Sequence, residues 1–214
     1  MENQLRTNLP EMPDRIKALP VSEKGYPVPF FVKYIDGKPD FRVMDPEKMK
    51  RCVESNLCWC CGQPLGRHKA FVGGPLLAIN LMSAEPPLHR DCAEFAVKAC
   101  PFLLYPNSKR RGTDDVAEQT TELGGGNVLP ENPGMTAVWI TNSYAVQNFS
   151  MGAIFALGLP SEILWYSAGQ PATKDDVIVA MHRSVQTAKK NPNIDKRQID
   201  MTEQNLQRAL AMYV

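Results

Sequence analysis

The stretches CWCCG at residues 58–62 and HRDC at residues 89–92 carry the strongest chemical signal in this chain. They form a CxxCG pair that is followed, after a loop, by an HxxC pair. Tetrahedral zinc is bound by thiolates and imidazoles, and a structural zinc site takes all four ligands from the protein. The sequence therefore predicts a closed site for Zn²⁺, with no position left for water, formed by Cys58, Cys61, His89 and Cys92.

The backbone after the first pair is expected to form a zinc knuckle and then a hairpin. Gly62 permits the tight turn that follows the second thiolate of a knuckle. Apolar residues at 69–72 and 76–79 flank Gly73-Gly74-Pro75, and this pattern predicts two short strands joined by a turn.

The second pair is expected to lie on a helix. Pro86-Pro87 precedes a helical pattern from about residue 88 to residue 100. His89 and Cys92 then fall three residues apart in its first turn, on one face. The order of knuckle, hairpin and helix is typical of a treble-clef module, so the predicted fold class is α+β around a treble-clef-like zinc module.

Other potential donors lie near the four predicted ligands. Cys60 is expected to point away from the metal, but it stays an alternative ligand, and His68 is an alternative should His89 not bind. Cys52 and Cys100 are expected to be buried core thiols, because free cysteine is among the most buried residue types.

Composition indicates an ordinary globular protein. The chain has 214 residues and a formal net charge of +1, so no global attraction to nucleic acid or membrane is expected. No apolar run approaches the ~20 residues of a membrane span, and the first residues do not resemble a secretory signal. Clustered thiols with a histidine then favour a reducing cytoplasmic location with bound zinc.

Proline, glycine and hydrophobic patterns divide the chain into four segments. Residues 1–28 are expected to form an irregular proline-rich arm, and residues 29–105 a hairpin with the zinc module. Residues 106–135 are predicted to be a loop or linker. Residues 136–214 are predicted to be a strand and helix lobe that forms one compact unit with residues 29–105.

The N-terminal elements carry clear local signals. A short helix is expected near residues 14–18, and Asp36-Gly37 predicts the turn of a hairpin over residues 29–44. Asp45 as N-cap and Pro46 at the first helical position predict a helix that ends near residue 56.

The C-terminal lobe is expected to contain three strands and two helices. The strands are predicted at residues 136–140, 153–156 and 162–166. Thr173 and Asp176 resemble a capping box that starts a helix, and a last helix is predicted over residues 202–213. One helical stripe is expected to face the core: Val177, Met181, Val185 and Ala188. Core positions are also expected for Trp139, Trp165 and Tyr166.

Two enzyme classes that bind zinc share parts of this motif pattern. A zinc deaminase needs HxE followed by PCxxC, and here the cysteine pair comes first, so that class is excluded by motif order. An HNH-type nuclease stays a secondary hypothesis, with His68 and Asn80 near the predicted hairpin. A further enzyme hypothesis rests on the polar residues Asp36, Asp40 and Glu85 alone.

Basic residues gather around the predicted zinc module. They suggest a phosphate-contacting patch, with Phe71 or Trp59 as stacking partners. Acidic residues from 114 to 118 follow closely and weaken this interpretation. The candidate nucleic-acid-binding residues are Arg67, Lys69, Arg90, Lys109, Arg110 and Arg111.

A set of short motifs runs through most of the chain. They are GYPVP at 25–29, DGKPDFR at 36–42, CWCCGQPLG at 58–66, GP at 74–75, SAEPP at 83–87, HRDCA at 89–93, ACPFL at 99–103 and GQPAT at 169–173. In these motifs the chain resembles a group of uncharacterised zinc-binding proteins from bacteria and phages. The resemblance implies zinc and a bacterial or phage-infected cytosol but supplies no activity, and Cys60 stands where the group more usually has another residue.

These observations favour a non-enzymatic role. The first functional hypothesis is a zinc-stabilised binding protein of the bacterial or phage cytosol that acts on a macromolecular partner, most directly a protein. The alternative is a nucleic-acid-binding or nucleic-acid-processing, HNH-like protein. No membrane partner is expected.

Overall fold

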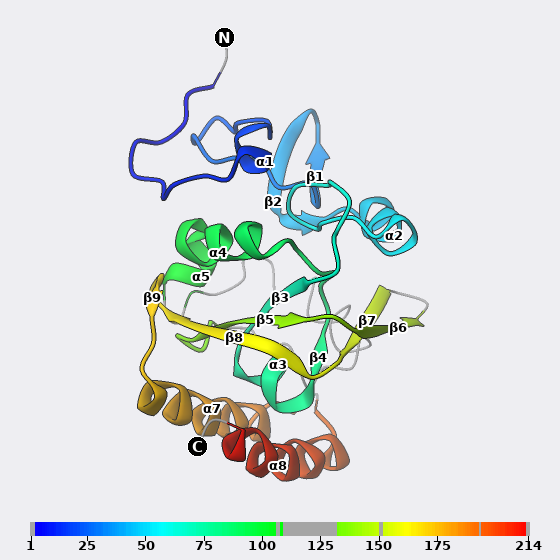
Figure 1. The fold of residues 1–214 in the computed structure, drawn as a ribbon, viewed down its shortest axis with the longest axis vertical. Coiled ribbons are helices and arrows are strands. Elements are labelled where there is room, and N and C mark those ends of the chain that lie inside the picture. The colour runs from blue at the N-terminus through cyan, green and yellow to red at the C-terminus, as the bar shows by residue number, and fades with distance from the viewer. Residues whose placement is uncertain (1–2, 106–107, 109–131, 150–151, 193, 213–214) are drawn as a thin grey trace.

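The fold is mixed α+β in a computed structural model of the chain (Figure 1). The structure describes all residues except 1–2, 106–107, 109–131, 150–151, 193 and 213–214. Most of the predicted 106–135 loop therefore lies outside the described residues, as do the basic residues Lys109, Arg110 and Arg111.

Two antiparallel sheets form the centre of the molecule. The larger sheet has the order β3-β5-β8-β9, made of β3 (Lys69–Gly73), β5 (Thr136–Thr141), β8 (Pro160–Ser167) and β9 (Gln170–Pro171). The smaller sheet has the order β4-β7-β6, made of β4 (Met82–Ser83), β7 (Gly152–Leu157) and β6 (Tyr144–Phe149). The pairings of β3 with β5 and of β4 with β7 join residues of the segments 29–105 and 136–214.

The three predicted strands near residues 136, 153 and 162 are confirmed as β5, β7 and β8. Strand β6 was not predicted, although it pairs with β7 along its whole length. Buried and exposed residues alternate along β6 as in a half-buried strand: Tyr144 and Val146 pack against the core, whereas Ala145 and Gln147 are exposed.

At β3 and β5 the larger sheet is buried or half-buried on both faces, and successive residues belong to two separate hydrophobic cores. Phe71 and Trp139 belong to one core, which we call the helical core because it also contains residues of α3, α7 and α8. Ala70, Val138 and Ile140 belong to the other, which we call the thiol core because it contains Cys58, Cys61 and Cys92. Figure 1 shows α4 on one side of this sheet and α3, α7 and α8 on the other.

The helical core is closed by α3 (Pro75–Asn80), α7 (Lys174–Lys189) and α8 (Lys196–Ala211). The predicted capping box of α7 is present: Thr173 accepts from the Asp176 amide, and Asp176 accepts from the Thr173 amide. The predicted stripe of α7 is confirmed as buried. Helix α8 begins at Lys196 rather than near residue 202, because Asp195 caps it by accepting from the Gln198 amide.

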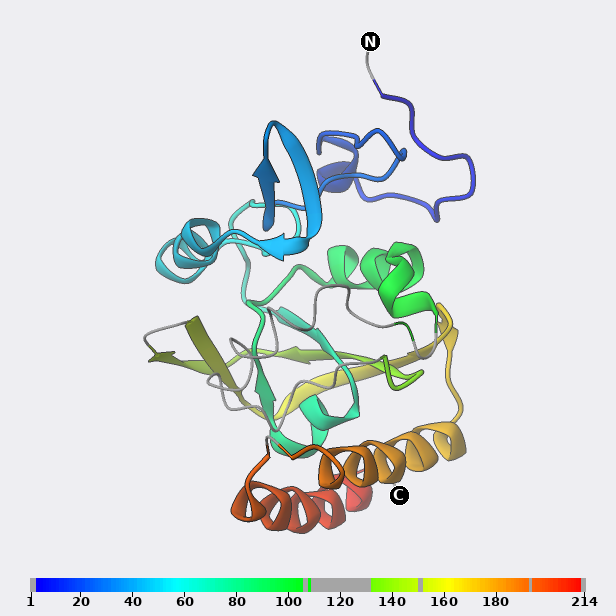
Figure 2. The same ribbon diagram turned by 180° about the vertical axis from the view of Figure 1, so that it is seen from behind.

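The N-terminal elements form as predicted. They are α1 (Asp14–Lys17), β1 (Val32–Ile35), β2 (Lys38–Met44) and α2 (Pro46–Ser55). Asp36 and Gly37 both have positive φ angles, of 50° and 76°, as a two-residue type I′ hairpin turn requires. Asp45 caps α2 by accepting from the amides of Glu47 and Lys48. Both views place α1 and this hairpin at the end of the molecule opposite α7 and α8 (Figures 1 and 2).

The hairpin predicted over residues 69–79 is wrong. Residues 75–80 form helix α3, and β3 pairs with β5 instead of with its neighbour in sequence. Pro75 lies at the first position of α3 after Gly74, a position where its missing N–H costs nothing. The short apolar run after it is compatible with a strand or a buried helix by pattern alone. In the structure it is a helix in which every residue from Pro75 to Ile79 is buried.

The predicted helix near residues 88–100 is present as α4 (Arg90–Ala99), followed by α5 (Pro101–Leu104). His89 is the N-cap residue of α4, so only Cys92 of the HxxC pair lies inside the helix. Within the described part of the chain, no helix is both long and apolar enough to cross a membrane.

Replacing the buried Met181 with alanine tests the assigned face of α7. Met181 is fully buried and Val179 is 66 % exposed on the same helix. Met181→Ala is expected to lower the free energy of unfolding by about 2–5 kcal/mol through the cavity that it creates. Val179→Ala, the control, is expected to change it by less than about 0.5 kcal/mol. Chemical denaturation measures both, and equal effects would contradict this packing.

Candidate metal centre

The four predicted ligands lie together in the structure. One donor atom from each of Cys58, Cys61, His89 and Cys92 lies within 4.8 Å of the other three. The three cysteines are buried and His89 is partly exposed. The first two donors come from the turn between Leu57 and Pro64, and the other two from the start of α4.

The turn between Leu57 and Pro64, which we call the knuckle, is held by its own backbone. The Cys58 amide donates to the Gln63 carbonyl over 2.8 Å, and the Gly62 amide donates to the Cys58 carbonyl over 2.8 Å. Gly62 has a φ of +71°, and a Cβ there would lie 2.7 Å from the ring of Phe30. The predicted need for glycine therefore has two causes, the left-handed backbone and the close approach of Phe30.

The orientation of His89 suits a metal ligand. Its Nδ1 lies 3.4 Å from Cys61 Sγ and 3.9 Å from Cys92 Sγ. Its Nε2 lies 3.0 Å from the Pro64 carbonyl oxygen, which can only accept a hydrogen bond. In a neutral ring this contact places the hydrogen on Nε2, so that the lone pair of Nδ1 faces the thiols. No side-chain signal predicts this contact, because any residue at position 64 carries a carbonyl group.

Backbone amides stabilise negative charge on Cys58. The amides of Cys61 and His89 point at Cys58 Sγ over 3.5 Å and 3.4 Å. Hydrogen bonds from the thiols of Cys61 and Cys92, together with these amides, hold the pKa of Cys58 well below its usual range.

The pKa values of the other two thiols move in the opposite direction. Hydrogen bonds with Cys58 are the main reason that the pKa values of Cys61 and Cys92 are raised, and burial adds to the effect. A thiolate at Cys58 therefore disfavours a second thiolate at Cys61 or Cys92. A divalent cation at the centre of the cluster would remove that opposition.

The donor set is suitable for a metal ion. Zinc–sulfur bonds of about 2.3 Å and zinc–nitrogen bonds of about 2.0–2.1 Å place tetrahedral donors roughly 3.5–3.8 Å apart. The 4.8 Å limit on all donor separations is compatible with that geometry after a small contraction. These four residues can therefore hold a metal ion.

The alternative donors do not belong to this group. Cys60 is buried beside it, and a hydrogen bond with the Cys60 thiol contributes to the raised pKa of Cys92. His68 is exposed on the loop before β3. Cys52 is buried as predicted, and burial is the main reason that its pKa is raised to about 12. Cys100 is only partly buried.

Two of the candidate nucleic-acid-binding residues, Arg67 and Arg90, meet at one open hollow of about 400 Å³. Arg90 is already paired there with Glu94 at 2.7 Å and with Glu162 at 2.8 Å. Lys69 Nζ donates to the Arg67 carbonyl over 3.4 Å. The hollow is lined by Arg15, Gly66, Arg67, His68, His89, Arg90, Asp91 and Glu94. Its basic side chains are thus largely balanced by carboxylates.

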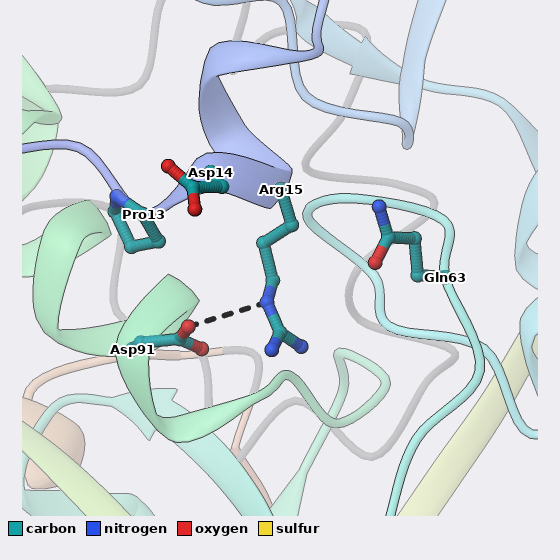
Figure 3. Close-up of a pocket in the computed structure, with 5 residues that line it drawn as sticks. All are labelled: Pro13, Asp14, Arg15, Gln63 and Asp91. Carbon is teal, nitrogen blue, oxygen red and sulfur yellow. Dashed lines mark ion pairs between the residues drawn. The ribbon is translucent and has the colours of Figure 1, made fainter.

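A second open hollow, of about 420 Å³, lies where α1 meets the start of α4 (Figure 3). In the close-up, the Arg15 guanidinium of α1 points at Asp91 of α4, and the two are paired at 3.2 Å. Asp91 also accepts from the Cys92 amide over 2.9 Å. This ion pair therefore ties α1 to the helical turn that carries a predicted metal ligand. The remaining lining residues are Pro13, Asp14 and Gln63.

The residues of the enzyme hypotheses are dispersed. Asn80 accepts from Asn205 of α8 and so lies on the helical side of the sheet, whereas His68 lines the hollow beside His89. Asp36 and Asp40 lie on the β1–β2 hairpin, where hydrogen bonds from Arg42 lower the pKa of Asp40 to about 2. Glu85 follows β4.

Comparisons with known proteins give no assignment: no family model, no curated protein and no solved structure matches the chain.

Replacing a ligand tests the centre directly. Cys61→Ala is expected to lose the bound metal and to lower the melting temperature, because three donors cannot close a structural site. Cys52→Ala removes a buried thiol outside the donor set and is expected to keep the metal. Elemental analysis of the purified variants gives the metal content. Metal retained in Cys61→Ala, or lost from Cys52→Ala, would mean that the ligand set is wrong.

Gly62→Ala tests the knuckle. The positive φ and the Phe30 ring oppose a methyl group there, so a loss of roughly 1–3 kcal/mol in unfolding free energy is expected. Gly66 has open space around its Cα and no positive φ, which makes Gly66→Ala the matched control. Thermal unfolding of the metal-loaded proteins provides the measurement, and a Gly62 variant as stable as the Gly66 variant would refute the strain.

Proposed function

We propose that this chain is a zinc-stabilised, non-enzymatic binding protein that acts on a macromolecular partner. The observation that carries the proposal is the closed donor set of three thiols and one imidazole within 4.8 Å. Thiolate and imidazole donors together favour zinc over hard cations such as magnesium or calcium. Four protein donors leave no coordination position for water or substrate, which supports a structural metal rather than a catalytic one.

We further propose that the knuckle, β3 and α4 act as a treble-clef-like module. Ala70 of β3 and Leu88, just before α4, exchange two backbone hydrogen bonds of 2.9 Å and 2.7 Å. This bridge supports the comparison because it brings the strand after the knuckle back to the start of the ligand-bearing helix. Helix α3 replaces the expected second strand between them.

A protein partner is favoured by the surface of the β1–β2 hairpin. Four large apolar side chains there are 38–45 % exposed: Tyr34, Ile35, Phe41 and Met44. Such a concentration on one small element is typical of an interaction surface. We propose a reducing cytosol for this activity, because the proposed ligands must stay reduced. The resemblance in the sequence motifs implies a bacterial or phage-infected cell.

Nucleic-acid binding, including an HNH-like activity, is the second candidate. The observation in its favour is the approach of Arg15, Arg67 and Arg90 to one hollow. Asp91 and Glu94 in the same lining reduce the net positive charge available to phosphate groups, so this candidate ranks below the protein partner.

Native mass spectrometry of protein freshly purified without chelator or high salt tests both candidates. One zinc ion with a retained protein is the expected result. A retained nucleic acid that dissociates steeply with salt would favour the second candidate. Protein that carries no metal would overturn the proposal.

A further inference from the structure

We propose that metal occupancy of the centre controls the docking of the N-terminal unit, defined as residues 3–44, onto the knuckle. This inference rests on the proposed zinc site and adds a conformational role to it. The N-terminal unit contains the arm, α1 and the β1–β2 hairpin, and so carries the apolar surface described above.

The contacts of the N-terminal unit point to the knuckle. The Phe30 amide donates to the Cys60 carbonyl over 2.7 Å. The ring of Phe31 stacks on Trp59 with centroids 5.1 Å apart and planes 20° apart. The ring of Phe30 lies against Gly62. Trp59, Cys60 and Gly62 of the knuckle, which alternate in sequence with the proposed ligands Cys58 and Cys61, therefore all contact the N-terminal unit.

Hydrophobic contacts also connect the N-terminal unit to the thiol core and not to the helical core. Among the described residues, Ile16 of the N-terminal unit belongs to the thiol core, and Leu9, Met12, Leu19, Phe30 and Phe31 pack against it. None of residues 3–44 belongs to the helical core or packs against it. The helical core in turn contains none of the four metal donors.

The two cores should therefore respond differently to the metal. Without a cation, the knuckle loses the bonds that draw its two thiols toward α4, and its outer face loses a fixed shape. The N-terminal unit then loses the Trp59 and Gly62 contacts, while the helical core keeps all of its own. Metal loss thus frees the hairpin and uncovers Trp59, which is 1 % exposed in the docked state.

Hydrogen exchange of the full chain, with one equivalent of zinc and after chelation, tests this mechanism. Amides of residues 14–35 are expected to exchange at least roughly tenfold faster without zinc, and those of α7 and α8, which belong to the helical core alone, to stay within about twofold. Equal acceleration everywhere would show that the metal holds the whole fold. No acceleration anywhere in a sample whose zinc was first bound and then removed would also overturn the inference, but would leave the zinc site intact. A chain that never binds zinc would instead refute the proposed function.

A variant separates docking from metal binding. Phe31→Ala removes the stack on Trp59 but no ligand, so the zinc-loaded variant should show faster exchange at residues 14–35. Because coupling is reciprocal, its zinc affinity should fall by a similar factor, roughly three- to tenfold for one aromatic contact. Phe41→Ala, an exposed ring on the same hairpin, is the matched control and should match the wild type in both measurements. Identical exchange and affinity in the Phe31 and Phe41 variants would overturn the inference.

Discussion

Burial of β5 on both of its faces is the constraint on which the rest of the structure depends. Every residue of β5 is buried, and Val138 and Ile140 belong to the thiol core while Trp139 between them belongs to the helical core. Each face then needs its own cover. Helices α3, α7 and α8 lie on one side of the sheet and α4 on the other. On the α4 side the knuckle thiols Cys58 and Cys61 belong to the same core as Val138. The metal centre is thereby part of a hydrophobic layer and is not an appendage to the fold.

Local signals in the sequence were enough to predict which four donors come together and most of the elements. Donor type and spacing singled out Cys58, Cys61, His89 and Cys92, which lie close enough to hold a metal ion, because each pair lies within one turn of backbone. Capping residues located α2 and α7 for the same reason. Long-range pairing was not readable: β3 pairs with a strand more than sixty residues later, and nothing near Lys69–Gly73 encodes that choice.

The contacts that support the donor cluster could not be predicted from the sequence either. The bond from His89 to the Pro64 carbonyl depends on backbone shape, and the contacts of Phe30 and Phe31 with the knuckle depend on how a distant segment folds back. The failure over residues 75–79 has a different cause. A short apolar run has no period of its own, so its pattern could not distinguish a strand from the buried helix that packs in one core with α7 and α8.

The pairing of Asp40 with Arg42 has a consequence for self-association. The Asp40 carboxylate accepts the Arg42 backbone amide over 3.0 Å as well as its guanidinium, and Pro39 has no amide hydrogen to donate. Neither Pro39 nor Arg42 therefore offers a free backbone N–H to an incoming strand. A two-stranded sheet is open to edge-to-edge aggregation unless its edges are blunted in this way. Two backbone positions of β2 are thereby removed as donors to an added strand, which lowers the tendency of a hairpin with exposed apolar side chains to recruit further copies of itself into a growing sheet.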